Sequence, residues 1–431
     1  MALPPWTIEL LRRGLNDVAR KASEPETLEK IKTQATEILQ DLPQTAAKGI
    51  DAVMRSAEAG KKSVQKWSRK HTALAVPVLN GSGVLLNEFG SGVPLSPQAS
   101  EIGRELMLGD TLSGSLMMER LDKRLRRLLP AGDHAIAVTS NFSSALTALA
   151  LLVDERQLVV HRSHAVRMPN GLALPDSFGM LLPVIQEVGS RDEVRASDFD
   201  GLDSFCAIMA DGGDVPAQLL DLPGADALQA VVLPVATLAS TDQAEIPSAE
   251  AMLTAGADFV ILPGNGVQGG PDCGILIGPE REIERIKSSS VWPSLVASEA
   301  VLGMLAVTLE IAAANFDNVP VGALLHTGEE NLRGRAERLA TRLSGSDRIR
   351  NVQVTAEDAR LNPSGRWRFP SRQLQLAHAT MSAADWQAEL LDEMPALATT
   401  VVDDMLRVDL RWVAAADDTK LAEALGGKTD A

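Results

Sequence analysis

Short apolar runs alternate with helical segments between residues 134 and 277, and this alternation constrains the fold more than any other feature of the chain. Each run is four to six residues long, the length of a strand that is buried on both faces. Strands that alternate with helices form mainly parallel sheets with helices on both sides. We therefore predict an α/β fold with strands at 134–138, 157–160, 204–209, 229–233, 258–262 and 274–277.

The pattern differs on either side of this region, so we predict three domains, at 1–71, 72–316 and 317–431. Helical spacing at 5–22, 25–41 and 44–70, broken by prolines, predicts an N-terminal helical module. After two further helices the pattern mixes helix and strand, which predicts a smaller C-terminal α+β domain. The expected helices lie at 282–288 and 297–315, and the mixed segments lie at 324–326, 330–342, 352–355, 383–391 and 405–413.

The charge of the chain is unevenly distributed. The net charge of -16 argues against a surface built as a whole to attract nucleic acid, because phosphate contacts need clustered Lys and Arg. Residues 1–71 carry +4, which leaves -20 on the rest. We interpret the basic cluster as a solvated helix face in preference to an RNA contact. This cluster consists of Lys61, Lys62, Lys66, Arg69 and Lys70.

Composition predicts a cytosolic protein with a large core. The 45% hydrophobic content suffices for such a core, yet the longest apolar runs fall short of the roughly 18 to 20 residues that cross a bilayer. No export signal opens the chain. The two cysteines, Cys206 and Cys273, lack metal-ligand spacing, which fits a reducing compartment and argues against a cysteine-based zinc site.

Residues 250–277 read as a helix end, a buried strand, a glycine loop and a second strand. With four further segments, this stretch resembles the selenocysteine synthase family, the bacterial L-seryl-tRNA(Sec) selenium transferases. The resemblance implies a fold-type I pyridoxal-phosphate architecture, with a large seven-stranded domain, a small C-terminal domain and at least a homodimer. The other segments that carry the resemblance are 79–96, 137–146, 158–176 and 405–413.

The same resemblance implies that the cofactor-binding groups have changed. Gly266 stands where the family has the lysine that forms the Schiff base, and Asn265 replaces the neighbouring aspartate. Thr237 falls at the position of the aspartate that contacts the pyridine nitrogen. Pyridoxal phosphate acts as an electron sink only with a lysine amine and a carboxylate at the ring nitrogen. The chain is therefore predicted to be a divergent member without a catalytic residue at these positions and without a covalent cofactor.

Arginines that the family uses for anionic substrates are also replaced. Their positions correspond to Gly92, to residues 112–116 and to residues 292–299, none of which contains Arg or Lys. Apolar or acidic side chains cannot replace the bidentate hydrogen bonds of a guanidinium group to phosphate. The joint loss favours a decayed or repurposed site.

A phosphorylated ligand, including pyridoxal phosphate, remains compatible with the sequence if it binds without a Schiff base. Residues 139–144 join a predicted strand to a helix, and a helix N-terminus binds phosphate. Ordinary capping by Ser140 or Asn141 is an equally good interpretation. His164 is a candidate to stack on a flat ligand ring. The predicted ligand contacts are Ser140, Asn141, Phe142, His164 and Asn265.

Other polar motifs predict ordinary structure. His161 and His164 lie three residues apart, but no further ligand is evident, so we predict no metal site. The glycines at 264–270 lack the spacing of a nucleotide-binding loop and indicate a turn. Asp211 and Asp214 bracket a Gly pair and also indicate a turn. Members of a Ser-His-Asp set need not be neighbours in sequence, so the sequence assigns none.

These observations support three functional hypotheses. The first is a non-catalytic binding or assembly protein, homo-oligomeric and partnered with an active homologue. The second is a pyridoxal-phosphate-dependent transferase or lyase that uses a lysine from elsewhere in the dimer. Lys287, at the end of a helix after the glycine loop, and Lys123, in a helix of mixed charge, are poor options for that lysine. In the third, residues 1–71 bind RNA while the body oligomerises.

Overall fold

The computed structural model describes residues 74–87, 93–109, 119–121, 123, 133–153, 156–168, 171–179, 185–211, 216–223, 226–241, 246–363 and 366–427. The chain divides into two compact units, 1–76 and 77–431. The predicted helices and basic cluster of residues 1–71 lie outside the described residues. The described helices and strands belong to the second unit.

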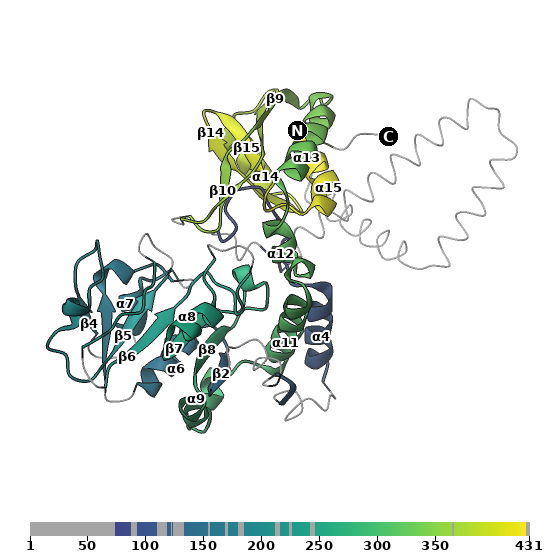
Figure 1. The fold of residues 1–431 in the computed structure, drawn as a ribbon. Coiled ribbons are helices and arrows are strands. Elements are labelled where there is room, and N and C mark those ends of the chain that lie inside the picture. The colour runs from purple at the N-terminus through teal and green to yellow at the C-terminus, as the bar shows by residue number, and fades with distance from the viewer. Residues whose placement is uncertain are drawn as a thin grey trace, which may run out of the picture. The chain divides into compact units, whose positions relative to one another are not determined.

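This unit contains a seven-stranded mixed sheet (Figure 1). Its strand order is β2-β8-β7-β6-β5-β3-β4, and only β8 runs antiparallel to its neighbours. The predicted, mainly parallel seven-stranded sheet is therefore confirmed. The strands are β2 (His134–Thr139), β3 (Gln157–His161), β4 (Gln186–Val188), β5 (Phe205–Ala210), β6 (Leu228–Val232), β7 (Phe259–Pro263) and β8 (Gly274–Pro279).

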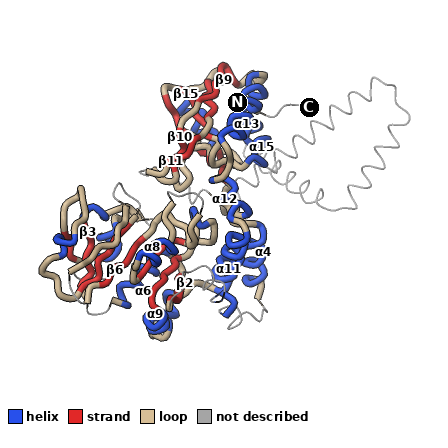
Figure 2. The backbone as a smooth tube through the Cα atoms, viewed as in Figure 1, coloured by secondary structure: helices blue, strands red, loops and turns tan. Residues whose placement is uncertain are grey.

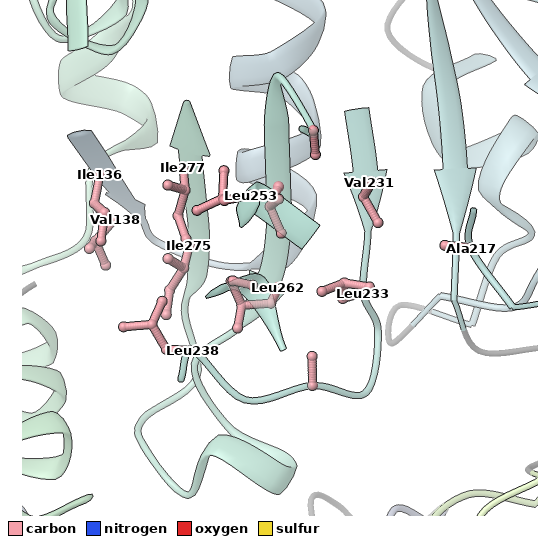
Figure 3. Packing of buried hydrophobic residues seen from close by; sticks show 14 of the residues in the cluster. Ile136, Val138, Ala217, Val231, Leu233, Leu238, Leu253, Leu262, Ile275 and Ile277 are labelled. Atoms are coloured by element: carbon pink, nitrogen blue, oxygen red, sulfur yellow. The ribbon is translucent and has the colours of Figure 1, made fainter. Parts of the chain in front are cut away.

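Alternate residues of these strands face two separate hydrophobic cores, as the period of two in a strand requires. On one face, Ile275 and Ile277 of β8 pack with residues of α8 (Ala249–Ala255) and α11 (Glu299–Ala314) (Figure 3). On the other face, Leu276 packs with residues of α6 (Phe142–Leu152) and α9 (Glu280–Lys287). Burial on both faces explains why the strands read as nearly continuous apolar runs.

Helices that flank the sheet begin at side-chain caps. Ser248 caps α8 and Ser298 caps α11, each by accepting a hydrogen bond from a backbone N–H of the first turn. Helix α4 (Pro97–Met107) begins at Ser96 in the same way and lies along α11, where small residues allow close approach. The remaining helices of this part are α7 (Leu174–Gly179), α10 (Trp292–Leu295) and α12 (Pro320–Leu325).

A second, antiparallel sheet lies in the C-terminal part, with the order β14-β15-β12-β9 (Figure 2). Three helices pack on it through residues such as Leu339 and Trp386 and form a third core. The predicted smaller α+β region is confirmed. Its elements are α13 (Glu329–Ser344), β9 (Ile349–Thr355), β12 (Gln373–His378), α14 (Ala383–Leu391), β14 (Thr400–Val402), β15 (Met405–Asp409) and α15 (Asp418–Gly426).

Two short pairings attach other segments to this C-terminal part. Strand β1 (Val78–Asn80) pairs in parallel with β13 (Ala396–Ala398). A hairpin of β10 (Asp358–Arg360) and β11 (Arg368–Pro370) lies beside residues 84–86. The two segments are joined by a hydrogen bond from Leu85 N to Arg360 O at 3.0 Å. Residues from the start of the unit are thus built into its C-terminal part.

Within the described part of the chain, no helix combines the length and the apolar character needed to cross a bilayer.

Candidate functional site

The candidate site lies at the edge of the large sheet where its parallel strands end. Strands β2, β3, β5, β6 and β7 run in one direction, so the loops that follow them meet at the same edge. In open α/β sheets this edge is where ligands bind. The residues predicted from the sequence for the ligand site all lie in or beside these loops, at 140–142, 164, 237 and 265–266.

Gly266 begins a short 3-10 turn after β7, at Gly266–Gln268, with φ at +64°. This is the left-handed region, which residues with a Cβ rarely adopt. A Cβ at this position would lie 3.1 Å from Leu86 Cδ2, so the side chain of Leu86 packs where a side chain of residue 266 would start. Next to it, Asn265 Nδ2 donates to Asp272 Oδ1 at 3.1 Å. The turn is therefore shaped for glycine.

Thr237 follows β6, and its hydroxyl is used locally. Its Oγ1 donates to Ala239 O at 2.8 Å, which closes a tight turn. The next backbone N–H, of Leu238, donates to Gln268 Oε1 at 2.7 Å and ties this turn to the glycine loop. Thr237 is buried and cannot carry a negative charge. It therefore cannot supply the carboxylate that a protonated pyridine nitrogen requires.

The loop after β2 is an ordinary N-cap. Asn141 is the capping residue of α6, and its Oδ1 accepts from Ser144 N at 2.9 Å. Ser140 Oγ and Ser144 Oγ lie 3.0 Å apart and are exposed. Phe142 is buried in the core, so it presents only backbone to the edge. The capping interpretation thus accounts for Asn141, while Ser140 keeps an exposed hydroxyl at the helix N-terminus.

His164 is fully buried at the end of β3, and its two ring nitrogens differ in their surroundings. Its Nδ1 accepts the backbone N–H of Ala210 at 2.6 Å, which places the proton of the neutral ring on Nε2. Nε2 is buried and has no hydrogen-bond partner among the described residues. Burial, together with the smaller effect of nearby His161, lowers the pKa of His164 to about 4. The ring is therefore a neutral donor near neutral pH.

The C-terminal hairpin covers this edge of the sheet. Arg366 Nη2 donates to Asp211 Oδ1 at 2.6 Å, and the Asp211 side chain is only 4% exposed. The guanidinium of Arg366 lies over the Trp367 ring, 4.7 Å from its centroid. Leu86 N donates to Leu361 O at 2.8 Å. Asp211 is thus more than a turn residue, because it joins the end of β5 to the hairpin.

Sequence reasoning missed Leu86, Asp211 and Arg366 as site residues, because their role depends on contacts between distant segments. Gly92, Asp214 and residues 112–116 lie outside the described residues. In the described part, His, Cys, Asp and Glu side chains nowhere form a group of three that could hold a metal ion.

Two features define the class of the fold. One is the order of the large sheet, with a single antiparallel strand next to an edge, and the other is the separate antiparallel C-terminal sheet. Together they are the structure of fold-type I pyridoxal-phosphate enzymes. The solved structure of D-glucosaminate-6-phosphate ammonia-lyase shares the fold, with a TM-score of 0.56 over 82% of this chain and 95% of that chain at 14% identity.

Sequence comparison finds similarity to L-seryl-tRNA selenium transferases. Residues 235–414 match the family model of L-seryl-tRNA selenium transferase. The L-seryl-tRNA(Sec) selenium transferase of Aquifex aeolicus is 23% identical over 401 residues, covering 85% of this chain and 86% of the relative. That of Nitratidesulfovibrio vulgaris is 25% identical over 401 residues, covering 83% and 82%. The chain is thus similar to L-seryl-tRNA selenium transferases over most of its length, at 23 to 25% identity to these two relatives.

The residues at the site do not fit a covalently held pyridoxal phosphate. Gly266 supplies no amine, and its backbone conformation and the packed Leu86 disfavour a side chain there. The Thr237 hydroxyl is bonded to a backbone carbonyl. Two described lysine amines, those of Lys287 and Lys420, form ion pairs with acids on or next to their own helices. The residues at these two positions therefore lack both groups that this cofactor needs, the amine for the Schiff base and the acid at the pyridine nitrogen.

Proposed function

We propose that this protein has kept the fold of its family without the Schiff-base chemistry and acts as a non-catalytic binding or assembly protein. The observation that carries the proposal is the turn at Gly266. A left-handed glycine with Leu86 against it is what remains where the resemblance to the family expects a lysine. The neutral Thr237 supports the same conclusion from a second strand end.

A phosphorylated ligand that is held without a covalent bond is part of this proposal. The exposed Ser140 hydroxyl at the N-terminus of α6 supports it, since the helix dipole favours an anion there. The buried N–H of His164 offers a donor at the same edge. We include homo-oligomerisation, an active homologue as partner and a cytosolic location as expectations of the same proposal.

The test is incubation of the purified full-length protein with an equimolar amount of pyridoxal phosphate. We expect no visible absorption band of a protein Schiff base, and no lysine modified stoichiometrically after borohydride reduction and peptide mass mapping. Nα-acetyl-lysine treated in parallel verifies that the reduction works. A single lysine modified to completion would overturn the proposal and would identify the amine.

The second candidate is a pyridoxal-phosphate-dependent transferase or lyase with a lysine supplied from elsewhere in an oligomer. The match to selenium transferases over more than 80% of this chain favours it. The same mapping experiment separates the two functions, because this candidate requires one reactive lysine. RNA binding through residues 1–71 is a third, separate proposal. It predicts tRNA affinity that falls steeply with added salt, and no binding at low salt would remove it.

A further inference from the structure

A hydrogen-bonded chain of a carboxylate, an imidazole and a hydroxyl lies at the end of β3. His161 Nε2 is 3.2 Å from Asp198 Oδ2, and His161 Nδ1 is 2.7 Å from Ser163 Oγ. Asp198 belongs to a distant 3-10 turn, Ala196–Phe199, so folding brings it to the imidazole. The order of groups is that of an activated serine: a nucleophile, its base and an acid that orients the base.

The proton positions are set by the backbone. Ser163 N donates to His161 Nδ1 at 3.2 Å, so Nδ1 carries the lone pair and the ring proton lies on Nε2. Nε2–H therefore donates to Asp198, and the Ser163 hydroxyl is left to donate to Nδ1. This is the tautomer in which an imidazole can take a proton from a serine.

Surrounding residues hold the imidazole in one orientation. His161 is fully buried and lies 6.4 Å from Phe199, ring centre to ring centre. Gly189, with φ at +69°, passes so close that a Cβ there would overlap His161 Nε2. Arg162 Nη1 donates to Gly189 O at 2.7 Å and fixes that backbone. Ser163 itself is only half-buried.

The His164 ring, next to His161, provides a second, independent observation. The His164 ring is 6.1 Å from the His161 ring, and its buried Nε2–H has no partner in the described part of the chain. An unpaired buried donor costs about 1 to 3 kcal/mol, so it is normally satisfied. Donors of this kind stabilise the oxyanion that forms when a serine attacks a carbonyl. The neighbourhood thus holds a base, a nucleophile and, on the ring next to the base, a buried N–H donor.

We propose that Ser163 is a nucleophile that accepts an acyl group from an activated ester or thioester. Ser163 Oγ forms a bond to the acyl carbon as its proton passes to His161 Nδ1. The alkoxide or thiolate leaves as the carbonyl re-forms, and it takes the proton from Nδ1. Water then releases the acid by the same steps in reverse order, with His161 as the base. Asp198 orients the ring and pairs with its positive charge.

This inference goes beyond the proposed function, whose loss of catalysis then applies to Schiff-base chemistry alone. It uses no residue of the Gly266 turn and shares only His164 with the proposed ligand site. A purely structural role is the competing explanation. His161 caps the 3-10 turn Arg162–His164, and the same bonds would serve that cap alone. His161→Asn separates the two, because Asn is a good N-cap and cannot act as the base.

The experiment uses the full-length protein with p-nitrophenyl acetate as substrate and a fluorophosphonate as covalent probe. We expect wild type to release p-nitrophenol and to carry the probe on Ser163 by peptide mass mapping. Ser163→Ala and His161→Asn should lose on the order of 100-fold in rate, as for removal of a general base. His161→Asn replaces a fully buried ring, so a cooperative unfolding transition and a wild-type circular dichroism spectrum verify that this variant is folded. Ser190→Ala, an exposed serine in the loop next to Gly189, is the matched control and should match wild type.

Absence of the probe from Ser163 in folded wild-type protein would overturn the proposal. So would equal rates for wild type and a folded His161→Asn variant, since the hydroxyl would then act without the imidazole.

Discussion

Gly266→Ala is the substitution that most directly tests how the site is built. At φ +64° a Cβ costs about 1 to 2 kcal/mol relative to glycine. The added methyl group also meets Leu86 Cδ2 at 3.1 Å, which forces the half-buried Leu86 side chain to move by a few tenths of an ångström. Overpacking costs about 1 to 3 kcal/mol, and a shift this small corresponds to about 1 kcal/mol, the lower end of that range. We expect Gly266→Ala to lower the free energy of unfolding by about 2 to 3 kcal/mol.

Urea unfolding followed by circular dichroism measures this difference, and Gly201→Ala is the matched control. Gly201 has φ at +83° with no described atom within 4 Å of a Cβ, so it reports the backbone cost alone. Leu86→Ala combined with Gly266→Ala should recover the steric part. Gly266→Lys should cost more than Gly266→Ala, because the longer side chain must displace Leu86. If Gly266→Ala unfolds at the wild-type urea concentration, the described turn and its contact with Leu86 are wrong.

Three further predictions concern the same edge of the sheet. Arg366→Ala should lower the free energy of unfolding by about 3 kcal/mol, because it removes the ion-pair partner of the buried Asp211 carboxylate. The double variant Arg366→Ala/Asp211→Ala should lose less free energy of unfolding than Arg366→Ala alone, as measured by urea unfolding. Gly189→Ala should lower the free energy of unfolding by about 2 to 4 kcal/mol, because the added methyl group overlaps His161. If Ser163 is active, the same change should also abolish its labelling by the probe. A wild-type melting curve would refute the described contact between Gly189 and His161. Folding lowers the pKa of His164 from 6.5 to about 4. The stability linked to this shift is complete above pH 6.5 and is lost as the pH falls toward 4, by up to about 3 kcal/mol. His164→Asn should therefore flatten the dependence of the urea midpoint on pH between these values.

Most of the large sheet was predictable because its strands are buried on both faces. The six apolar runs correspond to β2, β3, β5, β6, β7 and β8 within about two residues at each end. Strand β4 was missed because it lies at the sheet edge and reads Gln-Glu-Val, with no apolar run. Strand β12 was missed because it has no continuous apolar run, although the alternation in Gln373–His378 is itself the pattern of a half-buried strand. Strand order depends on pairing between distant segments and is absent from local patterns.

The candidate site was predictable only where one residue carries the information. The resemblance places Gly266 where the family has its Schiff-base lysine, and a single residue of the sequence carries this expectation. The packing of Leu86 against that glycine is not visible, because 180 positions separate them and only the fold joins them. The chain of groups from Asp198 through His161 to Ser163 was missed for the same reason, since the acid approaches from a turn that has no sequence signal.

The parallel pairing of β1 with β13 sets an order of events during synthesis. Val78, Leu79 and Asn80 leave the ribosome more than 300 residues before their partners Ala396, Leu397 and Ala398. Until those partners emerge, the backbone of this early strand lacks its hydrogen-bonded neighbour. The pairing of β1 with β13 can therefore form only after residue 398 has left the ribosome, and a fragment that begins at residue 317 lacks the strand that pairs with β13.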